Sequence, residues 1–177
     1  MRRILIIPGY MNSGEGHWQT LWENSIQNAK RVEMPNWNIP RKHGWIEALD
    51  EAIRRANDGG EPPILVAHGL GCIAVAHWAA ERHQHIHGAL LVAPDDVEKE
   101  DIYEAGKGWR PIPLMELPFT SKVVASSNDP FVSIERAREF ADAWRSTFTD
   151  IGARGHINTA SGFGPWTRGE TYLSDLL

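Results

Sequence analysis

The sequence predicts an α/β protein with three α/β/α layers, in which helices cover both faces of a mostly parallel, doubly wound sheet. Short apolar runs alternate with stretches of helical periodicity along the whole chain. The runs lack the polar alternation of a half-exposed sheet, as expected for strands buried on both faces. No repeat, low-complexity tract or linker interrupts the pattern, so residues 1–177 are expected to form a single domain.

Each element is predicted from its own periodicity. In the segment 44–58, Trp45, Leu49 and Ile53 fall on one face of a helix, and "RILIIPG" is typical of a buried strand that ends in a turn. The predicted strands are 3–9, 31–35, 63–67, 88–93, 121–126 and, more weakly, 147–151. The predicted helices are 17–29, 44–58, 70–83, 133–145 and 167–177.

The segment 94–118 has charge, glycine and proline but no clean periodicity. It is too long for an ordinary connection, which makes it a candidate lid or pocket wall. A surface excursion with a short helix is the alternative.

Composition restricts the classes of partner. Eighteen basic and 23 acidic residues give a formal charge of −5, and both signs are interspersed, so we expect no nucleic-acid or anionic-membrane surface. The single cysteine, Cys72, excludes an intrachain disulfide and fits a reducing compartment. The first apolar run stops at Pro8-Gly9, which is too short for a signal peptide, and no later run approaches a membrane span. A cytoplasmic location is expected.

The stretch "ILVAHGLGC" has the outline of a nucleophile elbow, the strand-to-helix turn that carries the attacking serine in many hydrolases. Ala67 and Gly71 supply the small flanking residues, but the central position is Gly69. Such a turn strains the backbone of a residue with a side chain by about 1–3 kcal/mol, whereas glycine adopts it without a clash. The geometry tolerates Gly69, and serine chemistry does not.

Two later residues have the order expected of an acid and a base. Asp129 follows the run 121–126 in a proline-containing turn, and His156 lies on a glycine-flanked loop after the last strand. Position 69, Asp129 and His156 therefore follow the nucleophile–acid–base order of α/β-hydrolases. The acid would hold the imidazole in one tautomer and stabilise the imidazolium. A turn-capping aspartate and an ordinary loop histidine are the alternatives.

The first strand ends in "IIPGYMNSG", which places flexible backbone beside the elbow. One oxyanion-hole N–H would come from Tyr10 or Met11 and the other from Leu70. Candidates to line an apolar substrate pocket are Met11, Trp18, Trp109 and Trp166, with core packing as the alternative for the tryptophans.

Four motifs, "PGYMNSGEGHWQTLWE", "VAHGLGC", "SSNDPFV" and "GHINTASGFGPW", together resemble the small serine hydrolases related to the retinoblastoma-binding serine hydrolase and its bacterial homologues. The resemblance covers essentially the whole chain. It implies a minimal α/β-hydrolase with a Ser-Asp-His triad, carboxyl-ester hydrolase activity on a small-molecule ester, and no cofactor. Asp129 and His156 fall on the family's acid and base, but Gly69 departs from its serine.

Other residues compete for these roles. Cys72 and Ser13 are alternative nucleophiles, for which structural roles are favoured, and Asp95 competes with Asp129 for the acid. His68 precedes the elbow and is expected to point away from the reaction centre. A metal site at His83, His85 and His87 is disfavoured, because these residues run from a helix end into a strand.

Three explanations of Gly69 remain open: a hydrolase whose serine has been replaced, a pseudoenzyme that binds a ligand or protein partner, and a hydrolase that activates water directly. The replaced serine is favoured because the acid, base and oxyanion loop all remain. Such a chain would be inactive or very slow.

Overall fold

The computed structural model describes residues 1–177, and its centre is one six-stranded sheet. Every neighbouring pair of strands is parallel, and their order is β2-β1-β3-β4-β5-β6. The predicted parallel, doubly wound sheet is confirmed. The strands are β1 (Ile4–Ile7), β2 (Ala29–Arg31), β3 (Ile64–His68), β4 (Gly88–Val92), β5 (Thr120–Ala125) and β6 (Thr147–Asp150).

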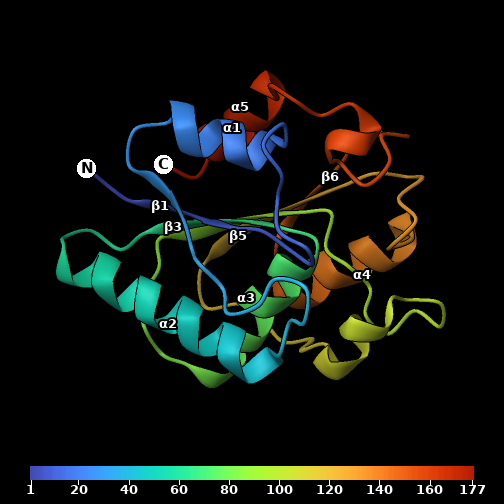
Figure 1. Ribbon diagram of the computed structural model, residues 1–177, viewed down its shortest axis with the longest axis horizontal. Helices are drawn as coiled ribbons and strands as arrows, with labels where there is room; N and C mark the ends of the chain where they lie inside the picture. The colour runs from blue at the N-terminus through green and yellow to red at the C-terminus, as the bar shows by residue number, and fades with distance from the viewer.

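Helices cover both faces of the sheet, as the sequence predicts. Helices α1 and α5 lie on one side, and α2, α3 and α4 lie on the other (Figure 1). The helices are α1 (Trp18–Ser25), α2 (Lys42–Asp58), α3 (Leu70–Glu81), α4 (Ile134–Trp144) and α5 (Thr167–Ser174), with short 3₁₀ turns η1 (Glu104–Trp109) and η2 (Thr159–Ser161).

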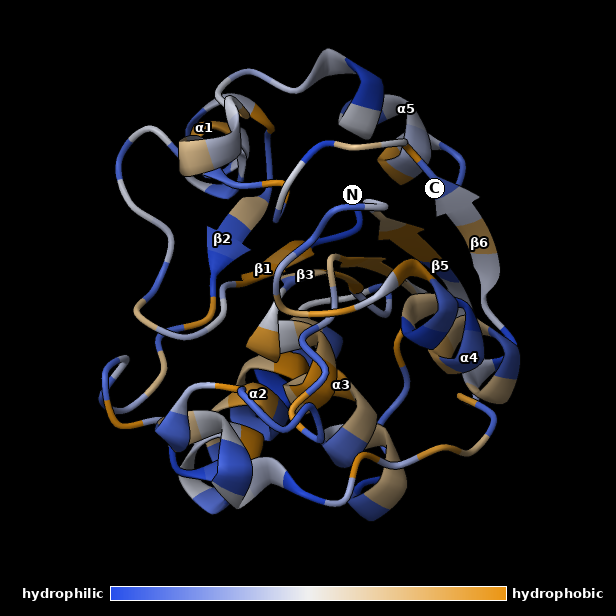
Figure 2. Cartoon of the chain, turned by 90° about the vertical axis from the view of Figure 1, so that its right-hand side faces the viewer, coloured by the Kyte–Doolittle hydropathy of each residue, from blue (hydrophilic) through white to orange (hydrophobic).

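The strands supply apolar side chains to two cores, one on each face of the sheet. Because successive residues of a strand point to opposite faces, Ile4 and Ile6 pack with α1 and α5, whereas Leu5 and Ile7 pack with α2 and α3. The apolar colouring of β1 and β5 and the polar outer faces of the helices are visible in Figure 2. This two-sided burial explains why the strands are continuous apolar runs in the sequence.

Two predicted boundaries near the N-terminus are wrong. The first helix was expected over 17–29 but ends at Ser25, and Asn28 takes a positive φ of 68° that turns the chain into β2. The next strand was expected over 31–35 but comprises Ala29–Arg31. Pairing decides this difference, because the residues of this segment that pair in register with Ile4 to Ile6 of β1 are Ala29 to Arg31.

The segment 94–118 contains only the short turn η1. Trp109 anchors it, because its side chain is fully buried and its indole N–H donates to the carbonyl of Pro40 at 2.9 Å. Tyr103 of this segment reaches the cavity described below.

Strand order determines where a ligand could bind. The chain moves from β1 outward to β2 and then returns across β1 to β3, so the topological switch lies between β1 and β3. Ligand sites of doubly wound sheets lie beyond the carboxyl ends of the strands at this point. No helix is both long and apolar enough to cross a membrane.

Candidate functional site

The turn between β3 and α3 has the backbone of a nucleophile elbow. Gly69 has φ 58° and ψ −123°, a conformation that side chains rarely adopt. Gly71 is required for a different reason, because a Cβ there would overlap the carbonyl oxygen of Ile7 in the neighbouring strand. Glycine at position 71, which has no Cβ, therefore allows α3 to begin directly against the sheet.

The structure brings His156 and Asp129 together beside this turn. The Nδ1 of His156 lies 2.9 Å from each carboxylate oxygen of Asp129, so the imidazole donates its Nδ1 proton to that carboxylate. The backbone N–H of Phe131 also donates to Asp129 Oδ1 at 2.9 Å, which fixes the carboxylate. The Nε2 of His156 is 3.3 Å from the position that a Cβ on Gly69 would occupy.

A second carboxylate, that of Asp95, faces the other side of the imidazole. Its Oδ1 lies 3.3 Å from His156 Nε2 and 3.3 Å from the Cβ position of Gly69. Tyr103 donates its hydroxyl proton to Asp95 Oδ2 at 2.5 Å. The sequence made Asp95 a competitor for the acid position on Nδ1, but the structure places it beside Nε2 and the elbow instead.

The electrostatics of these groups follow from burial and from each other. Burial raises the pKa of Asp95 to about 6, although the charge of His156 and the hydroxyl of Tyr103 oppose this shift. Burial also opposes charging of His156, but the hydrogen bond to Asp129 and the charges of both carboxylates outweigh it and raise the pKa of the imidazole. The imidazolium form of His156, which lies between two carboxylates, is therefore more stable than that of an ordinary histidine.

Strained backbone surrounds the site. Four non-glycine residues with positive φ lie within two residues of Tyr10, Asp95 or His156 in the chain. They are Met11 (66°), Asn12 (66°), Ala93 (50°) and Ile157 (50°). Each such conformation costs about 1–3 kcal/mol and persists where surrounding contacts impose it. The strain at Ala93 and Ile157 lies in the turns that carry Asp95 and His156.

The residues expected to supply the oxyanion hole differ in whether their backbone N–H groups are already hydrogen-bonded. The N–H of Met11 donates to the carbonyl of Trp37 at 3.0 Å and is therefore occupied. Tyr10 lies outside the regular elements, and its N–H has no hydrogen bond within the protein. Leu70 is the first residue of α3, so its N–H has no acceptor one turn earlier in the helix. Of the two residues considered at the first strand, Tyr10 is the one with a free donor.

These groups open into a cavity of about 330 Å³. Met11 lines it, as expected, but Trp18, Trp109 and Trp166 do not, which corrects the prediction of a tryptophan-lined pocket. Trp18 and Trp109 are fully buried in the two cores, and Trp166 packs edge-on against Trp18. The cavity is lined by Gly9, Tyr10, Met11, Asn12, His17, His68, Gly69, Leu70, Asp95, Tyr103, Phe131, His156 and Asn158.

Two further histidines form part of this wall. His68 was expected to point away from the reaction centre, but its Nε2 donates to the backbone carbonyl of His156 at 2.8 Å. His17 caps α1, because its Nδ1 accepts from the N–H of Gln19 at 3.1 Å. This bond leaves the proton of neutral His17 on Nε2, which is buried without a partner. The sequence offered only the position of "GHW" before a helix as a signal for His17.

The alternative nucleophiles are engaged elsewhere. The thiol of Cys72 is fully buried and donates to the carbonyl of Val92, and burial raises its pKa well above the ordinary value. The hydroxyl of Ser13 donates to Gln19 Oε1 at 2.6 Å, and Ser13 does not line the cavity. No group of three or more potential ligands is arranged to hold a metal ion, and His83, His85 and His87 are exposed.

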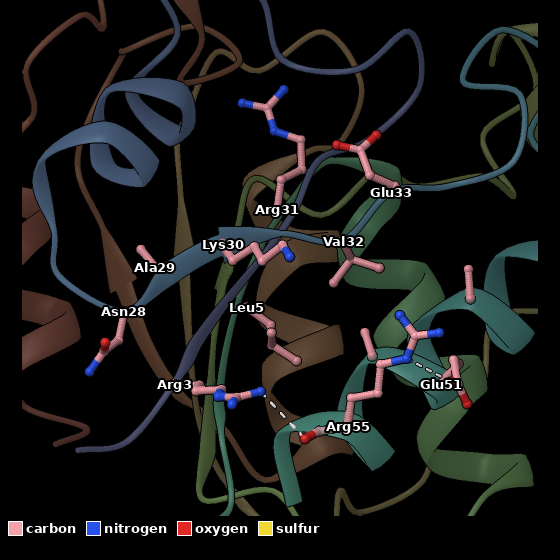
Figure 3. A pocket seen from close by; sticks show the side chains of 12 residues that line it. Arg3, Leu5, Asn28, Ala29, Lys30, Arg31, Val32, Glu33, Glu51 and Arg55 are labelled. Atoms are coloured by element: carbon pink, nitrogen blue, oxygen red, sulfur yellow. Dashed lines mark hydrogen bonds and ion pairs between the residues drawn. The ribbon is translucent and has the colours of Figure 1, made fainter. Parts of the chain in front are cut away.

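A larger cavity of about 760 Å³ lies at the β2 edge of the sheet, between β2 and α2 (Figure 3). Its arginines already have partners: Arg55 pairs with Glu51 at 2.7 Å, and Arg31 pairs with Glu23 at 3.1 Å. Arg3 donates to the carbonyl of Arg55 at 3.4 Å. The lining of this larger cavity contains no imidazole and no hydroxyl group. The smaller cavity, which contains His156, is therefore the candidate active site.

Known proteins match this chain over nearly its whole length. A profile of the serine hydrolase family matches residues 4–175. A YdeN-like hydrolase from Pectobacterium atrosepticum is 31% identical, with a TM-score of 0.85, and the match covers 99% of this chain and 90% of that one. No curated protein sequence matches the chain.

More distant structures share the fold. The ydeN gene product of B. subtilis is 19% identical, with a TM-score of 0.79 over 99% of this chain and 98% of that one. Est1E from Butyrivibrio proteoclasticus, solved with ferulic acid bound, is 13% identical, with a TM-score of 0.72 over 99% and 86% of the two chains. The chain therefore belongs to the serine hydrolase family, with glycine at the elbow position where the serine is expected.

Proposed function

We propose that the cavity around Gly69 is the active site of a carboxyl-ester hydrolase whose serine mechanism is disabled by the missing hydroxyl. One observation carries the proposal. The Nδ1 of His156 is hydrogen-bonded to Asp129 at 2.9 Å, while its Nε2 lies 3.3 Å from the Cβ position of residue 69. A base oriented by an acid and aimed at an elbow is the arrangement that activates a serine. The substrate would be a small or medium acyl ester, which the volume of about 330 Å³ can accommodate.

The mechanism follows from these positions once a hydroxyl is supplied by Gly69→Ser. The hydroxyl attacks the ester carbonyl while His156 accepts its proton and Asp129 stabilises the imidazolium. The N–H groups of Tyr10 and Leu70 stabilise the oxyanion. His156 then protonates the leaving alcohol and activates water, which releases the acid.

The cost of the glycine is large. Removal of a triad serine has lowered turnover by about 2 × 10⁶ in a protease, near 8.6 kcal/mol at about 1.36 kcal/mol per decade. Binding and an oxyanion hole alone retain about 10³–10⁴ over water. Serine-type turnover by the chain as written is therefore absent.

The test is restoration of the hydroxyl. Because Asp95 Oδ1 lies only 3.3 Å from the Cβ position of residue 69, Gly69→Ser is made alone and together with Asp95→Ala. The folded double variant is expected to hydrolyse p-nitrophenyl acetate and to be labelled by a fluorophosphonate at residue 69. A double variant that folds but neither hydrolyses nor is labelled would overturn the proposal. A module that binds a protein partner would instead retain its partner when Asp129 and His156 are both changed to Ala.

A further inference from the structure

The carboxylate of Asp95 borders the region that a serine hydroxyl would fill. Its Oδ1 is 3.3 Å from the Cβ position of Gly69, and the missing hydroxyl would lie one bond from that Cβ. The same Oδ1 is 3.3 Å from His156 Nε2, the nitrogen that would contact a nucleophile. A carboxylate oxygen of this chain, supplied by the loop after β4, thus lies 3.3 Å from both the elbow's Cβ position and His156 Nε2.

The two oxygens of Asp95 differ in how they are held. Oδ2 accepts the proton of Tyr103, whereas Oδ1 is buried and accepts no hydrogen bond, with His156 Nε2 at 3.3 Å as its charged neighbour. The side chain is 3% exposed, although it lines the cavity. Leaving a buried carboxylate oxygen without a donor is costly, and such atoms in folded proteins call for an explanation. The free lone pairs of Oδ1 provide one.

We propose that Asp95 is the nucleophile of the unaltered chain, acting on esters whose leaving group is a stabilised anion such as an aryl oxide. This inference rests on the proposed hydrolase site, whose base, acid and oxyanion donors it uses. Carboxylates serve as nucleophiles in covalent catalysis and need no base to activate them. A carboxylate therefore replaces the serine hydroxyl without requiring His156 to remove a proton first.

In the first half-reaction Oδ1 attacks the acyl carbon, and the carbonyl electrons form an oxyanion facing the N–H groups of Tyr10 and Leu70. The intermediate collapses with cleavage of the acyl–oxygen bond, which gives a mixed anhydride between Asp95 and the acyl group. The leaving oxygen takes the proton of the His156 imidazolium. A phenol or other acidic alcohol departs, and His156 is left neutral.

In the second half-reaction neutral His156 removes a proton from water, and the resulting hydroxide attacks the acyl carbon of the anhydride. The carboxylate of Asp95 leaves with its electron pair, the carboxylic acid is released, and His156 is again an imidazolium. The sum is ester plus water to acid plus alcohol. No oxidant, metal or other reactant is required.

The leaving-group restriction follows from relative basicity. The tetrahedral intermediate expels the weaker base, and a carboxylate is a far weaker base than an alkoxide. An alkyl ester would therefore return to starting material, whereas an aryl oxide competes with Asp95 as a leaving group. Aryl esters are expected to react and ethyl esters are not.

The experiment incubates the unaltered chain with p-nitrophenyl acetate and hydroxylamine and maps the adduct by mass spectrometry. We expect release of p-nitrophenol above the buffer rate and a hydroxamate on Asp95. The variant Asp95→Asn is expected to lose both. Asp96→Asn is the matched control, because the adjacent carboxylate lies outside the cavity and pairs with Arg136 at 3.5 Å; it should behave like the unaltered chain.

The outcomes separate this inference from the proposed function. Full activity in Asp95→Asn, or an adduct on another residue, would overturn the role of Asp95. An inactive unaltered chain would also overturn it, while the proposed hydrolase site would stand if the double variant with Gly69→Ser and Asp95→Ala is active. If both are inactive, both proposals fail. Adduct mapping on the unaltered chain remains decisive even where a substitution prevents folding.

Discussion

The Oδ1 of Asp95 lies 3.3 Å from the Nε2 of His156, on the side of the imidazole opposite to Asp129. His156 is therefore held between two carboxylates, one on each ring nitrogen. The region between Asp95, His156 and the elbow is where a serine hydroxyl would otherwise lie.

Adding a side chain to the elbow should destabilise the fold. Gly69→Ala places a Cβ at φ 58° and 3.3 Å from both Asp95 and His156. We expect the free energy of unfolding in urea to fall by about 1–3 kcal/mol. Gly108→Ala is the control, because a Cβ there meets nothing within 4 Å. Equal stabilities of the two variants would show that the elbow is not strained.

Asp129 should matter for catalysis in the restored enzyme. The test uses the double variant with Gly69→Ser and Asp95→Ala as its background. There, Asp129→Asn replaces the negatively charged carboxylate that accepts the Nδ1 proton of His156 with a neutral amide. The expected loss in kcat toward p-nitrophenyl acetate is about 10⁴-fold. Asp150→Asn, on the exposed end of β6, is a control that should leave kcat unchanged. A comparable loss in both variants would argue against the acid role.

The stability of the protein should depend on His17 in acid. Burial, followed by the charges of His156 and Arg31, lowers the pKa of His17 to about 4 from an ordinary value of 6.5. Because the folded pKa lies below the unfolded one, the stability linked to neutral His17 is present above pH 6.5 and is lost as the pH falls through about 4.

Denaturation of the unaltered chain and of His17→Gln across this pH window measures the effect. Relative to the variant, the unaltered chain should lose on the order of 3 kcal/mol of unfolding free energy between pH 6.5 and 4, at about 1.4 kcal/mol for each tenfold difference in proton affinity. Parallel pH curves for the two proteins would contradict the assignment.

Tyr103 should set the pH range in which Asp95 is ionised. Its hydroxyl stabilises the carboxylate of Asp95 and so lowers a pKa that burial has raised to about 6. Tyr103→Phe removes this donor, and the pKa of Asp95 should rise further. The midpoint of adduct formation on Asp95 should move to higher pH, whereas Tyr172→Phe, in α5, should leave it in place. A shift to lower pH would contradict the role of Tyr103.

Arg31 should hold the loop that carries Tyr10. Its guanidinium, 9% exposed, donates to Asn12 Oδ1 and to the carbonyl of Ser13, both at 2.9 Å, and pairs with Glu23 at 3.1 Å. Arg31→Met removes these donors and should lower the unfolding free energy by about 3–5 kcal/mol. Arg54→Met is the control, because its ion pairs lie on the exposed face of α2 and should not measurably affect stability.

Much of the fold and part of the site were predictable from local sequence. Apolar runs and helical periodicity predict the strands and helices, because burial on two faces of a parallel sheet leaves a pattern in consecutive residues. The sequence also predicted the three parts of the site, because each follows a predicted strand and has the residue type that the role requires. The structure places the elbow, Asp129 and His156 together. The start of β2 was not predictable, because pairing with β1 determines it.

Only the tertiary structure decided what surrounds the imidazole. Asp95 and Tyr103 come from the segment 94–118, whereas His68 and His17 come from two other parts of the chain, and no spacing in the sequence relates them to His156. They meet because parallel strands bring their carboxyl ends to one edge, where strained turns direct the side chains inward. The sequence by itself determined the layers and the missing serine, whereas packing across the sheet decided which carboxylates contact His156.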